Sequence, residues 1–523
     1  MADQFTRLYS AALHGVDAVQ VDIEVNAAGS GDAKTTVTIV GLPDAAVKES
    51  SERVWAAVKN SGFKPPHGRI TINLAPGDLR KEGPSFDLAI AVGLIAVSKD
   101  VDIPEEALEK CFIAGELALD GSVRPVRGVL SLAQEAKRCG RKAIMVPVEN
   151  AAEAAVVDGI FAYGVETLRD VVDLLCGNGN VKPTRLDRQA FFEQNRQYDI
   201  DFNDVKGQLS VKRAVEVAVA GGHNILMIGP PGTGKSMLAK RIATIMPLMT
   251  ESQAIETTKI HSIAGLLDSK SAFLATRPFR SPHHTISDAG LLGGSHNPRP
   301  GEVSLAHNGI LFLDELPEFR RSTLEVMRQP LEDGKVTISR ASGTMTFPAR
   351  FMLVAAMNPC PCGYFGDPKR ECRCGSQQVL KYRQRISGPL LDRIDIHVEV
   401  PIVDYKELSG KATGEPSEAI RLRVETVRNQ QLERFTANAG EAAGVTTNIS
   451  MTPRLMKQHC QLDAESAGLL EQAMNELNFS ARAHDRILKV ARTLADLAGN
   501  DTIQPDNLLE AIQYRSLDRT LWT

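Results

Sequence analysis

The octapeptide Gly229-Pro-Pro-Gly-Thr-Gly-Lys-Ser236 indicates the fold of the central part of the chain, because it fits the pattern G-x-x-x-x-G-K-[ST] at every fixed position. It follows an apolar run at residues 224–229 and precedes a helical pattern at residues 235–246. A strand, a glycine-rich loop and a helix in this order predict a phosphate-binding turn, since backbone N–H groups and the helix N-terminus attract phosphate oxygens. We expect Lys235 to reach the β- and γ-phosphates of ATP and Ser236 to bind Mg²⁺. All eight residues are expected to contact the nucleotide: Gly229, Pro230, Pro231, Gly232, Thr233, Gly234, Lys235 and Ser236.

Two further apolar runs, residues 310–315 and residues 351–358, lack polar alternation and are typical of buried parallel strands. Asp314 and Glu315 end the first run, at the kind of strand end where α/β proteins place their ligands. We expect Asp314 to hold Mg²⁺ and Glu315 to polarise the attacking water, with a solvated acidic pair as the alternative. Asn358 ends the second run and is expected to contact the γ-phosphate and that water, although an Asn after a strand is often only a turn former.

Size and composition indicate a large, soluble protein of about three domains. The chain has 523 residues, of which 43% are hydrophobic and 24% charged, and its formal net charge is -4. This charge excludes a global basic field, so any contact with nucleic acid requires a local patch or an assembled ring. The N-terminus lacks a signal-like apolar core, and no apolar run approaches the roughly 18 residues of a membrane span. We therefore expect a cytoplasmic protein without a membrane partner.

The chain divides by pattern into three domains and one linker. Residues 1–180 alternate β-branched strands with helices, as a mixed α/β domain does, and residues 181–201 are a polar linker. Residues 202–445 hold the phosphate loop and the apolar strands, and residues 446–523 show helical spacing of apolar residues. The predicted fold class is α/β, with a C-terminal helical lid.

Four of the eight cysteines form a tight cluster between residues 360 and 374. Two C-x-C pairs with a short loop between them supply enough thiolates for a tetrahedral site. We expect structural Zn²⁺ there, with free or redox-active thiols as the alternative. The ligands would be Cys360, Cys362, Cys372 and Cys374, and Lys369, Arg370 and Arg373 make the loop basic enough to suggest a contact with DNA.

Five segments together resemble one branch of the AAA+ ATPases. They are GPPGTGKS at 229–236, RPFRSPHHTISDAGLLGG at 277–294, GILFLDELPEF at 309–319, AAMNPCPCG at 355–363 and GPLLDRIDIHVEV at 388–400. The chain resembles the Mg-chelatase-like AAA+ ATPases and, within them, the bacterial YifB/ComM family, over essentially its whole length. This resemblance implies a hexameric ring with each nucleotide at a subunit boundary.

In such a ring, two arginines match motif positions of the family. Arg393 matches the arginine finger, which contacts the γ-phosphate bound to the neighbouring subunit. The alternative interpretation of Arg393 is an ordinary salt bridge. Arg482 matches the second sensor arginine on the helical lid, with Arg486 as the competing choice one turn later.

Two segments of the ATPase region exceed a minimal P-loop domain. Residues 283–300 are predicted to be an insertion, and residues 335–351 alternate as a hairpin with its tip at Ala341, Ser342 and Gly343. The resemblance implies that such a hairpin lines the pore of the ring. Arg340 is then a candidate phosphate contact, or else an ordinary exposed arginine.

Residues 81–96 and 115–129 resemble the Lon-protease proteolytic fold, which is S5-like. The resemblance places Ser85 at the nucleophile position, where a lysine base is also required. The matching segment has Leu130 and Leu132 where that lysine is expected. We therefore expect a non-proteolytic scaffold or a DNA-interaction module.

Three functions compete at this point. The family resemblance implies an ATP-dependent hexameric DNA motor, that is, a helicase for branch migration in natural transformation and recombination. Single-stranded or branched DNA, and recombination proteins, would be its partners. The alternatives are a Mg-chelatase-type ATPase subunit that remodels a protein partner, and a protease or protease regulator. The cysteine cluster and the Lon-like segment favour the first, because chelatase ATPase subunits resemble only the P-loop part.

Overall fold

The structure is a computed structural model that describes residues 4–28, 35–268, 272–294, 299–340, 343–367, 370–403, 414–436 and 444–517. The chain forms two compact units. The first consists of Met1–Asn195, Glu251–Ala275 and Ser339–Phe347, and the second of Arg196–Thr250, Thr276–Ile338 and Pro348–Thr523. The predicted domain boundaries remain predictions, but a segment inside the predicted ATPase core, Glu251–Ala275, belongs to the first unit.

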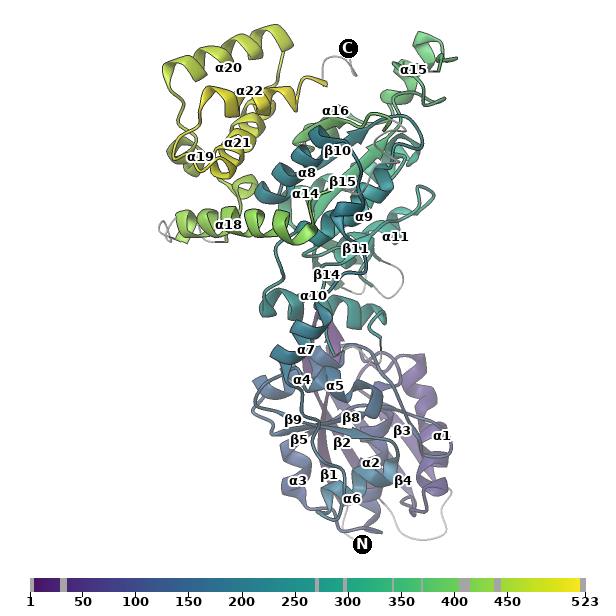
Figure 1. Cartoon of the computed structure of the whole chain (residues 1–523). Helices are drawn as coiled ribbons and strands as arrows, with labels where there is room; N and C mark the ends of the chain where they lie inside the picture. Colours follow the sequence, from purple (N-terminus) through teal and green to yellow (C-terminus); the bar gives the residue numbers. More distant parts are fainter. Residues whose placement is uncertain are drawn as a thin grey trace. The chain divides into compact units, whose positions relative to one another are not determined.

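The first unit is built on a seven-stranded mixed sheet in the order β3-β4-β2-β1-β5-β8-β9 (Figure 1). Its long antiparallel ribbon, β1 with β2, continues antiparallel to β4, while β3–β4 and β1–β5–β8–β9 are parallel. The strands are β1 Gln4–His14, β2 Asp17–Ala28, β3 Thr36–Val40, β4 Arg69–Ala75, β5 Cys111–Ile113, β8 Ala143–Pro147 and β9 Phe161–Val165, with a separate pair, β6 Glu116–Leu117 and β7 Val123–Arg124.

Helices pack on this sheet through apolar residues at helical spacing. In α1, Val47, Val54 and Val58 are buried, and the Asp44 carboxylate caps the helix by accepting from the Val47 N–H at 2.8 Å. In α2, nearly every side chain is buried, so this helix lies at the centre of the core. The helices are α1 Ala45–Asn60, α2 Asp87–Ser98, α3 Glu105–Lys110, α4 Val129–Arg138, α5 Ala151–Ala154, α6 Leu168–Leu175, α7 Arg188–Asn195 and α10 Glu251–Ala264.

The second unit contains a five-stranded parallel sheet in the order β11-β12-β15-β10-β16. Its three central strands, β10, β12 and β15, are buried at every residue, which explains why their sequences show no polar alternation. The strands are β10 Ile225–Ile228, β11 Phe279–Arg280, β12 Ile310–Leu313, β15 Met352–Met357 and β16 Ile396–Glu399. The prediction of buried parallel strands is confirmed.

The predicted hairpin is also present, as β13 Lys335–Arg340 paired with β14 Gly343–Pro348. Its expected tip residues Ala341 and Ser342, and the side chain of Arg340, lie outside the described residues. In the predicted insertion, residues 295–298 lie outside them as well, and α11 Asp288–Leu292 precedes the gap. The remaining helices around the sheet are α8 Leu209–Gly221, α9 Lys235–Ile245, α12 Glu302–Leu305, α13 Arg321–Glu325, α14 Arg328–Asp333, α15 Ser376–Arg383 and α16 Gly388–Leu391.

The chain ends in helices, as predicted: α18 Ser417–Thr436, α19 Pro453–His459, α20 Ala464–Leu477, α21 Ala481–Leu497 and α22 Pro505–Gln513 (Figure 1). Ser480 caps α21 by accepting from the Ala483 N–H, and the helix buries Ile487, Ala491 and Leu494 on one face. These side chains share one hydrophobic core with α8 and the central sheet. Among the described residues, no helix combines the length and the apolarity needed to cross a lipid bilayer.

Candidate nucleotide site and cysteine cluster

The parallel register brings the predicted nucleotide residues to one edge of the sheet. Ile228 pairs with Met357, and Leu313 pairs with Ala355, so β10, β12 and β15 end side by side. The residues that directly follow β10, β12 and β15 are Gly229, Asp314 and Asn358, respectively. Residues separated by more than a hundred positions therefore meet at the carboxyl edge, where ligands of open α/β sheets bind.

The P-loop has the backbone of a phosphate cradle. Gly232 and Gly234 adopt φ values of 82° and 86°, a left-handed conformation that side-chain-bearing residues rarely adopt. At Gly229, a Cβ atom would lie 2.3 Å from the carbonyl oxygen of Val400, so only glycine fits. By contrast, the space around a Cβ placed on Gly232 is open. The loop is thus closed toward the sheet and open on the side where phosphates would lie.

Lys235 is the buried cation of this cradle. Its side chain is largely inaccessible to solvent, and its Nζ donates to the carbonyl oxygens of Gly229 at 2.7 Å and Pro230 at 2.8 Å. A third contact, at 3.3 Å, reaches Oδ1 of Asn358. Burial lowers the pKa of Lys235, and the carboxylate of Asp314 opposes that shift. The ammonium group is therefore held beside both the loop and the end of β15.

Ser236 and Asp314, the two residues expected to bind Mg²⁺, contact each other. The Ser236 hydroxyl donates to Oδ2 of Asp314 at 2.6 Å, although the two residues are 78 positions apart. Oδ1 of the same carboxylate accepts from the Glu315 N–H at 2.9 Å. A hydroxyl and a carboxylate are ligands that Mg²⁺ prefers, so the donor set fits that ion.

Glu315 has a neighbour that sequence reasoning missed. It adopts a left-handed backbone conformation with φ of 52°, and its Oε2 lies 3.2 Å from Nδ1 of His284. The His284 ring lies 4.1 Å from the His283 ring between centroids, with the planes tilted by 34°, and is edge-on to Phe319. Only the quoted family segment 277–294 signalled His284, because nothing in its local pattern points to Glu315.

Arg393 is buried in its own chain. Its side chain is 6% exposed, and its guanidinium donates to the Glu332 carboxylate and to the Pro389 carbonyl oxygen. Its Nε atom is buried without a partner. The structure thus contains the intra-chain salt bridge considered as the alternative at this position, while the arginine-finger role remains a prediction.

The two candidate sensor arginines on α21 differ in their surroundings. Arg482 is exposed in the first turn. Arg486, one turn later, donates to Oδ1 of the fully buried Asp395 at 2.7 Å. Arg486 therefore has a structural partner within the chain, whereas the guanidinium of Arg482 is accessible to a ligand.

The four clustered cysteines converge as predicted. The four Sγ atoms of Cys360, Cys362, Cys372 and Cys374 all lie within 4.8 Å of one another. Three of the Sγ separations are 3.3, 3.6 and 3.7 Å, and a tetrahedral zinc with bonds of about 2.3 Å places sulfurs about 3.8 Å apart. The Tyr364 N–H lowers the pKa of the Cys362 thiol to about 6, whereas burial and the neighbouring thiols raise the pKa values of Cys372 and Cys374. The donor set fits Zn²⁺, and Lys369 lies outside the described residues.

In the first unit, Ser85 lies in a short 3-10 helix, Pro84–Phe86. The two leucines at the expected lysine position, Leu130 and Leu132, are buried in α4. Lys81, four positions before Ser85 in the sequence, is fully buried, and its ammonium donates to the carbonyl oxygen of Pro76. None of these contacts supplies Ser85 with a base.

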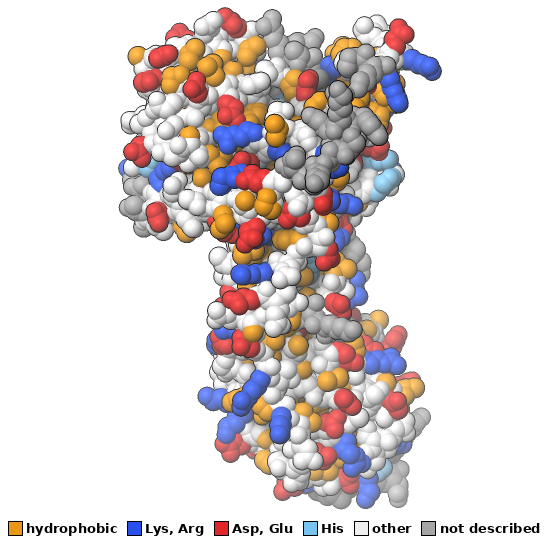
Figure 2. Space-filling view, in the orientation of Figure 1, with side chains coloured by type: hydrophobic (Ala, Val, Ile, Leu, Met, Phe, Trp, Pro, Cys, Tyr) orange, Lys and Arg blue, Asp and Glu red, His pale blue; other side chains and the backbone are white. Residues whose placement is uncertain are grey.

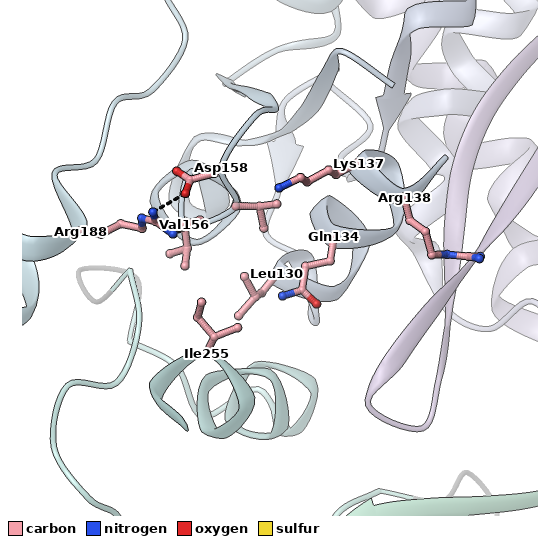
Figure 3. Close-up of a pocket in the computed structure, with 9 residues that line it drawn as sticks. Leu130, Gln134, Lys137, Arg138, Val156, Asp158, Arg188 and Ile255 are labelled. Atoms are coloured by element: carbon pink, nitrogen blue, oxygen red, sulfur yellow. Dashed lines mark hydrogen bonds and ion pairs between the residues drawn. The ribbon is translucent and has the colours of Figure 1, made fainter. Parts of the chain in front are cut away.

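The first unit also contains a cavity of about 470 Å³ (Figure 3). Its wall combines apolar side chains, including Leu130 and Ile255, with Lys137 and Arg188. Figure 3 shows Arg188 paired with Asp158 at one side of the cavity, and Arg188 also pairs with Glu251. The predicted site residues lie elsewhere.

On the face that Figure 2 shows, Lys and Arg are mixed with Asp and Glu, in line with the near-neutral composition.

Three family models match the chain in succession. They are "Subunit ChlI of Mg-chelatase" at residues 23–150, "Magnesium chelatase, subunit ChlI" at residues 201–408 and "Magnesium chelatase, subunit ChlI C-terminal" at residues 414–515. The chain therefore has the fold of the Mg-chelatase-like AAA+ ATPases.

Comparison with individual relatives shows which family within this class the chain belongs to. The competence protein ComM of Haemophilus influenzae is 43% identical over 518 residues, covering 98% of each chain. The uncharacterized protein YifB of Escherichia coli is 41% identical over 518 residues, covering 98% of this chain and 97% of YifB. Lon protease 2 of Bacillus subtilis is 29% identical over 173 residues, 30% of each chain. The chain belongs to the YifB/ComM family, and a Lon-like domain precedes its AAA+ core.

Proposed function

We propose that this protein is an ATP-dependent hexameric DNA motor that moves branched or single-stranded DNA, as a helicase for branch migration in recombination and transformation. The name of the full-length relative, a competence protein, supports the biological setting. Cytoplasmic localisation and recombination proteins as partners are part of the same proposal.

The observation that carries the proposal is the convergence of Lys235, Ser236, Asp314 and Asn358 at one sheet edge. Lys235 would hold the β- and γ-phosphates, and Ser236 with Asp314 would hold Mg²⁺. When bound, the metal ion neutralises phosphate charge as the γ-phosphoryl group transfers to water. Glu315 would accept a proton from that water, and the amide of Asn358 would orient the water and the γ-phosphate.

Assembly would complete the site. Arg393 would leave Glu332 and turn toward the nucleotide of the adjacent subunit, where a cation stabilises the charge of the transition state. Exposed Arg482 would contact the γ-phosphate from the helical lid. The hairpin of β13 and β14 would face the pore, with Arg340 as a candidate phosphate contact.

Two further parts complete the proposal. Zn²⁺ held by the four cysteines would fix residues 360–374, and the basic residues there would approach DNA. The Lon-like domain would be a scaffold or a DNA-interaction module without peptidase activity, because buried Leu130 and Leu132 stand at the lysine position. The boundaries 1–180, 181–201, 202–445 and 446–523 are proposed for the domains.

A Mg-chelatase-type ATPase subunit is the second candidate, since all three family models carry that description. One of them matches residues 23–150, so the expectation that chelatase subunits resemble only the P-loop part is wrong, and the N-terminal part does not favour the DNA motor. Such a subunit would remodel a protein partner rather than DNA. The choice between the two functions depends on which macromolecule stimulates ATP hydrolysis.

The test is a branch-migration assay on a Holliday-junction substrate with purified protein and ATP, with Glu315→Gln as the inactive control. We expect junction movement with the wild-type chain only, together with stimulation of ATP hydrolysis by branched or single-stranded DNA. If DNA neither binds nor stimulates hydrolysis while a protein partner does, the DNA motor is rejected in favour of the second candidate.

A further inference from the structure

We propose that the four-cysteine cluster regulates the nucleotide site: a bound zinc ion holds Asn358 and the P-loop in place, so that ATP affinity depends on metal occupancy. The inference rests on the proposed function, because it assumes that ATP binds at residues 229–236. It adds a second role for a metal that would otherwise fix only residues 360–374.

The first observation is the shortness of the connection between the two sites. Cys360 is fully buried and follows Asn358 with only Pro359 between them. Because proline has a fixed φ angle, the backbone between the Asn358 amide and the Cys360 thiol has little conformational freedom. Asn358 in turn contacts Nζ of Lys235 at 3.3 Å. A single residue, Pro359, thus separates the proposed metal ligand from a side chain that contacts Lys235.

The second observation is a direct contact between the cysteine loop and the P-loop. Gly363, next to Cys362, adopts φ of 86° and packs against the ring of Pro231. A Cβ atom at this position would lie 2.6 Å from Cδ of Pro231, closer than nonbonded carbon atoms approach. The backbone of the cysteine loop therefore supports one side of the phosphate cradle.

The third observation is a contact between α15, which follows Cys374, and the residue that precedes Cys360. Cys374 leads within two residues into α15, and Arg383 at the end of α15 donates through Nε to the carbonyl oxygen of Pro359 at 3.0 Å. Tyr382 hydrogen-bonds the backbone of Asn358. Both cysteine pairs are therefore anchored to the segment Asn358–Pro359, one through the chain and one through α15.

Metal binding decides whether this closed arrangement persists. Thiols are weak hydrogen-bond donors and acceptors, so they contribute little to holding two cysteine pairs together across residues 363–371. A zinc ion would replace those weak contacts with four strong bonds and so tie the two cysteine pairs to each other. Without it, Gly363 is free to leave Pro231, and Asn358 loses its fixed position beside Lys235.

One experiment compares ATP affinity with and without the metal. Full-length protein is purified, its zinc content is measured, and the affinity for a fluorescent ATP analogue is determined before and after chelation, and after zinc is restored. We expect about one zinc ion per chain and a loss of affinity of roughly tenfold or more on removal, since small displacements in such sites have large effects. Cys372→Ser should behave as the chelated protein does. Cys176→Ser, outside the cluster, should not.

A second comparison separates the contact from the fold of the loop. Gly363→Ala and Gly366→Ala place a Cβ at equally unfavourable φ values of 86° and 80°, but open space surrounds Gly366. Both variants should retain zinc, and only Gly363→Ala should bind the ATP analogue more weakly. Equal affinities of the two glycine variants, or of the zinc-loaded and zinc-free proteins, overturn this inference alone. Zinc-loaded wild-type protein that binds no ATP overturns the proposed function instead.

Discussion

The Nδ1 atom of His284 lies 3.2 Å from Oε2 of Glu315, the carboxylate expected to activate water. The two side chains are 29% and 54% exposed, so their contact is a partly solvated one. A partly solvated contact of this kind, whether a hydrogen bond or an ion pair, contributes about 1 kcal/mol or less, which limits the size of any effect on the reaction.

His284→Ala should therefore raise the basal rate of ATP hydrolysis by up to about fivefold, because it releases a carboxylate oxygen that the water needs. Nucleotide affinity should stay unchanged, since the contacts of His284 are with Glu315, His283 and Phe319 and not with the P-loop. Steady-state kinetics measure both quantities, with His14→Ala, an exposed histidine of the first unit, as the control. A lower rate would mean that His284 orients Glu315 productively.

Glu315→Gln should bind ATP normally and hydrolyse it about 10²- to 10⁴-fold more slowly, because the amide cannot accept the proton of the attacking water. Single-turnover hydrolysis and binding of a fluorescent ATP analogue test the two parts. Glu318→Gln, three residues later and paired with Arg385, is the matched control. Turnover near the wild-type rate in Glu315→Gln would show that another residue activates the water.

Lys235→Ala should weaken nucleotide binding by at least about tenfold. Lys235 is buried, and among the described residues it supplies the one buried ammonium group at the P-loop. Lys240→Ala changes an exposed lysine on the same helix and should bind as the wild type does. Calorimetric titration with ADP and ATP measures the difference. Equal affinities of the two variants would contradict the assignment of Lys235.

Arg393→Ala should leave nucleotide binding intact and slow hydrolysis by about a thousandfold or more, the scale of an arginine finger. Mixing it with Lys235→Ala subunits should restore some activity, because the two defects then fall on different subunits of one interface. Arg385→Ala, which removes a half-exposed arginine paired with Glu318, is the control. If mixing restores nothing, Arg393 acts only through its pair with Glu332.

Stability should fall in acid through His223. This ring is fully buried, its Nε2 lies 2.9 Å from the Thr493 hydroxyl, and burial lowers its pKa to about 4. The unfolded chain takes up the proton near pH 6.5, so the contribution is intact above pH 6.5 and is lost as the pH falls toward 4. One pKa unit corresponds to about 1.4 kcal/mol, so the loss is on the order of 3 kcal/mol.

Urea denaturation between pH 4 and pH 7, followed by circular dichroism, measures this slope. His223→Asn should show a flatter pH dependence over the same window, whereas His14→Gln should follow the wild type. A wild-type profile that stays level between pH 6.5 and 4 would contradict the assignment to His223.

The sequence alone determined the parts whose signal is local. The P-loop of residues 229–236, the strands that end at Asp314 and Asn358, and the C-x-C pairs each depend on neighbours within a few positions, because turns, strands and chelating pairs are short-range structures. Motif order then identified the family before any contact was known.

Only the tertiary structure decided which side chains meet across long distances. The pairing of His284 with Glu315, the burial of Arg393 against Glu332 and the packing of Gly363 on Pro231 join segments that have no common periodicity. The membership of residues 251–275 in the first unit is of the same kind. Such contacts depend on the crossover connections of a parallel sheet, which bring distant strand ends together without leaving a local pattern in the sequence.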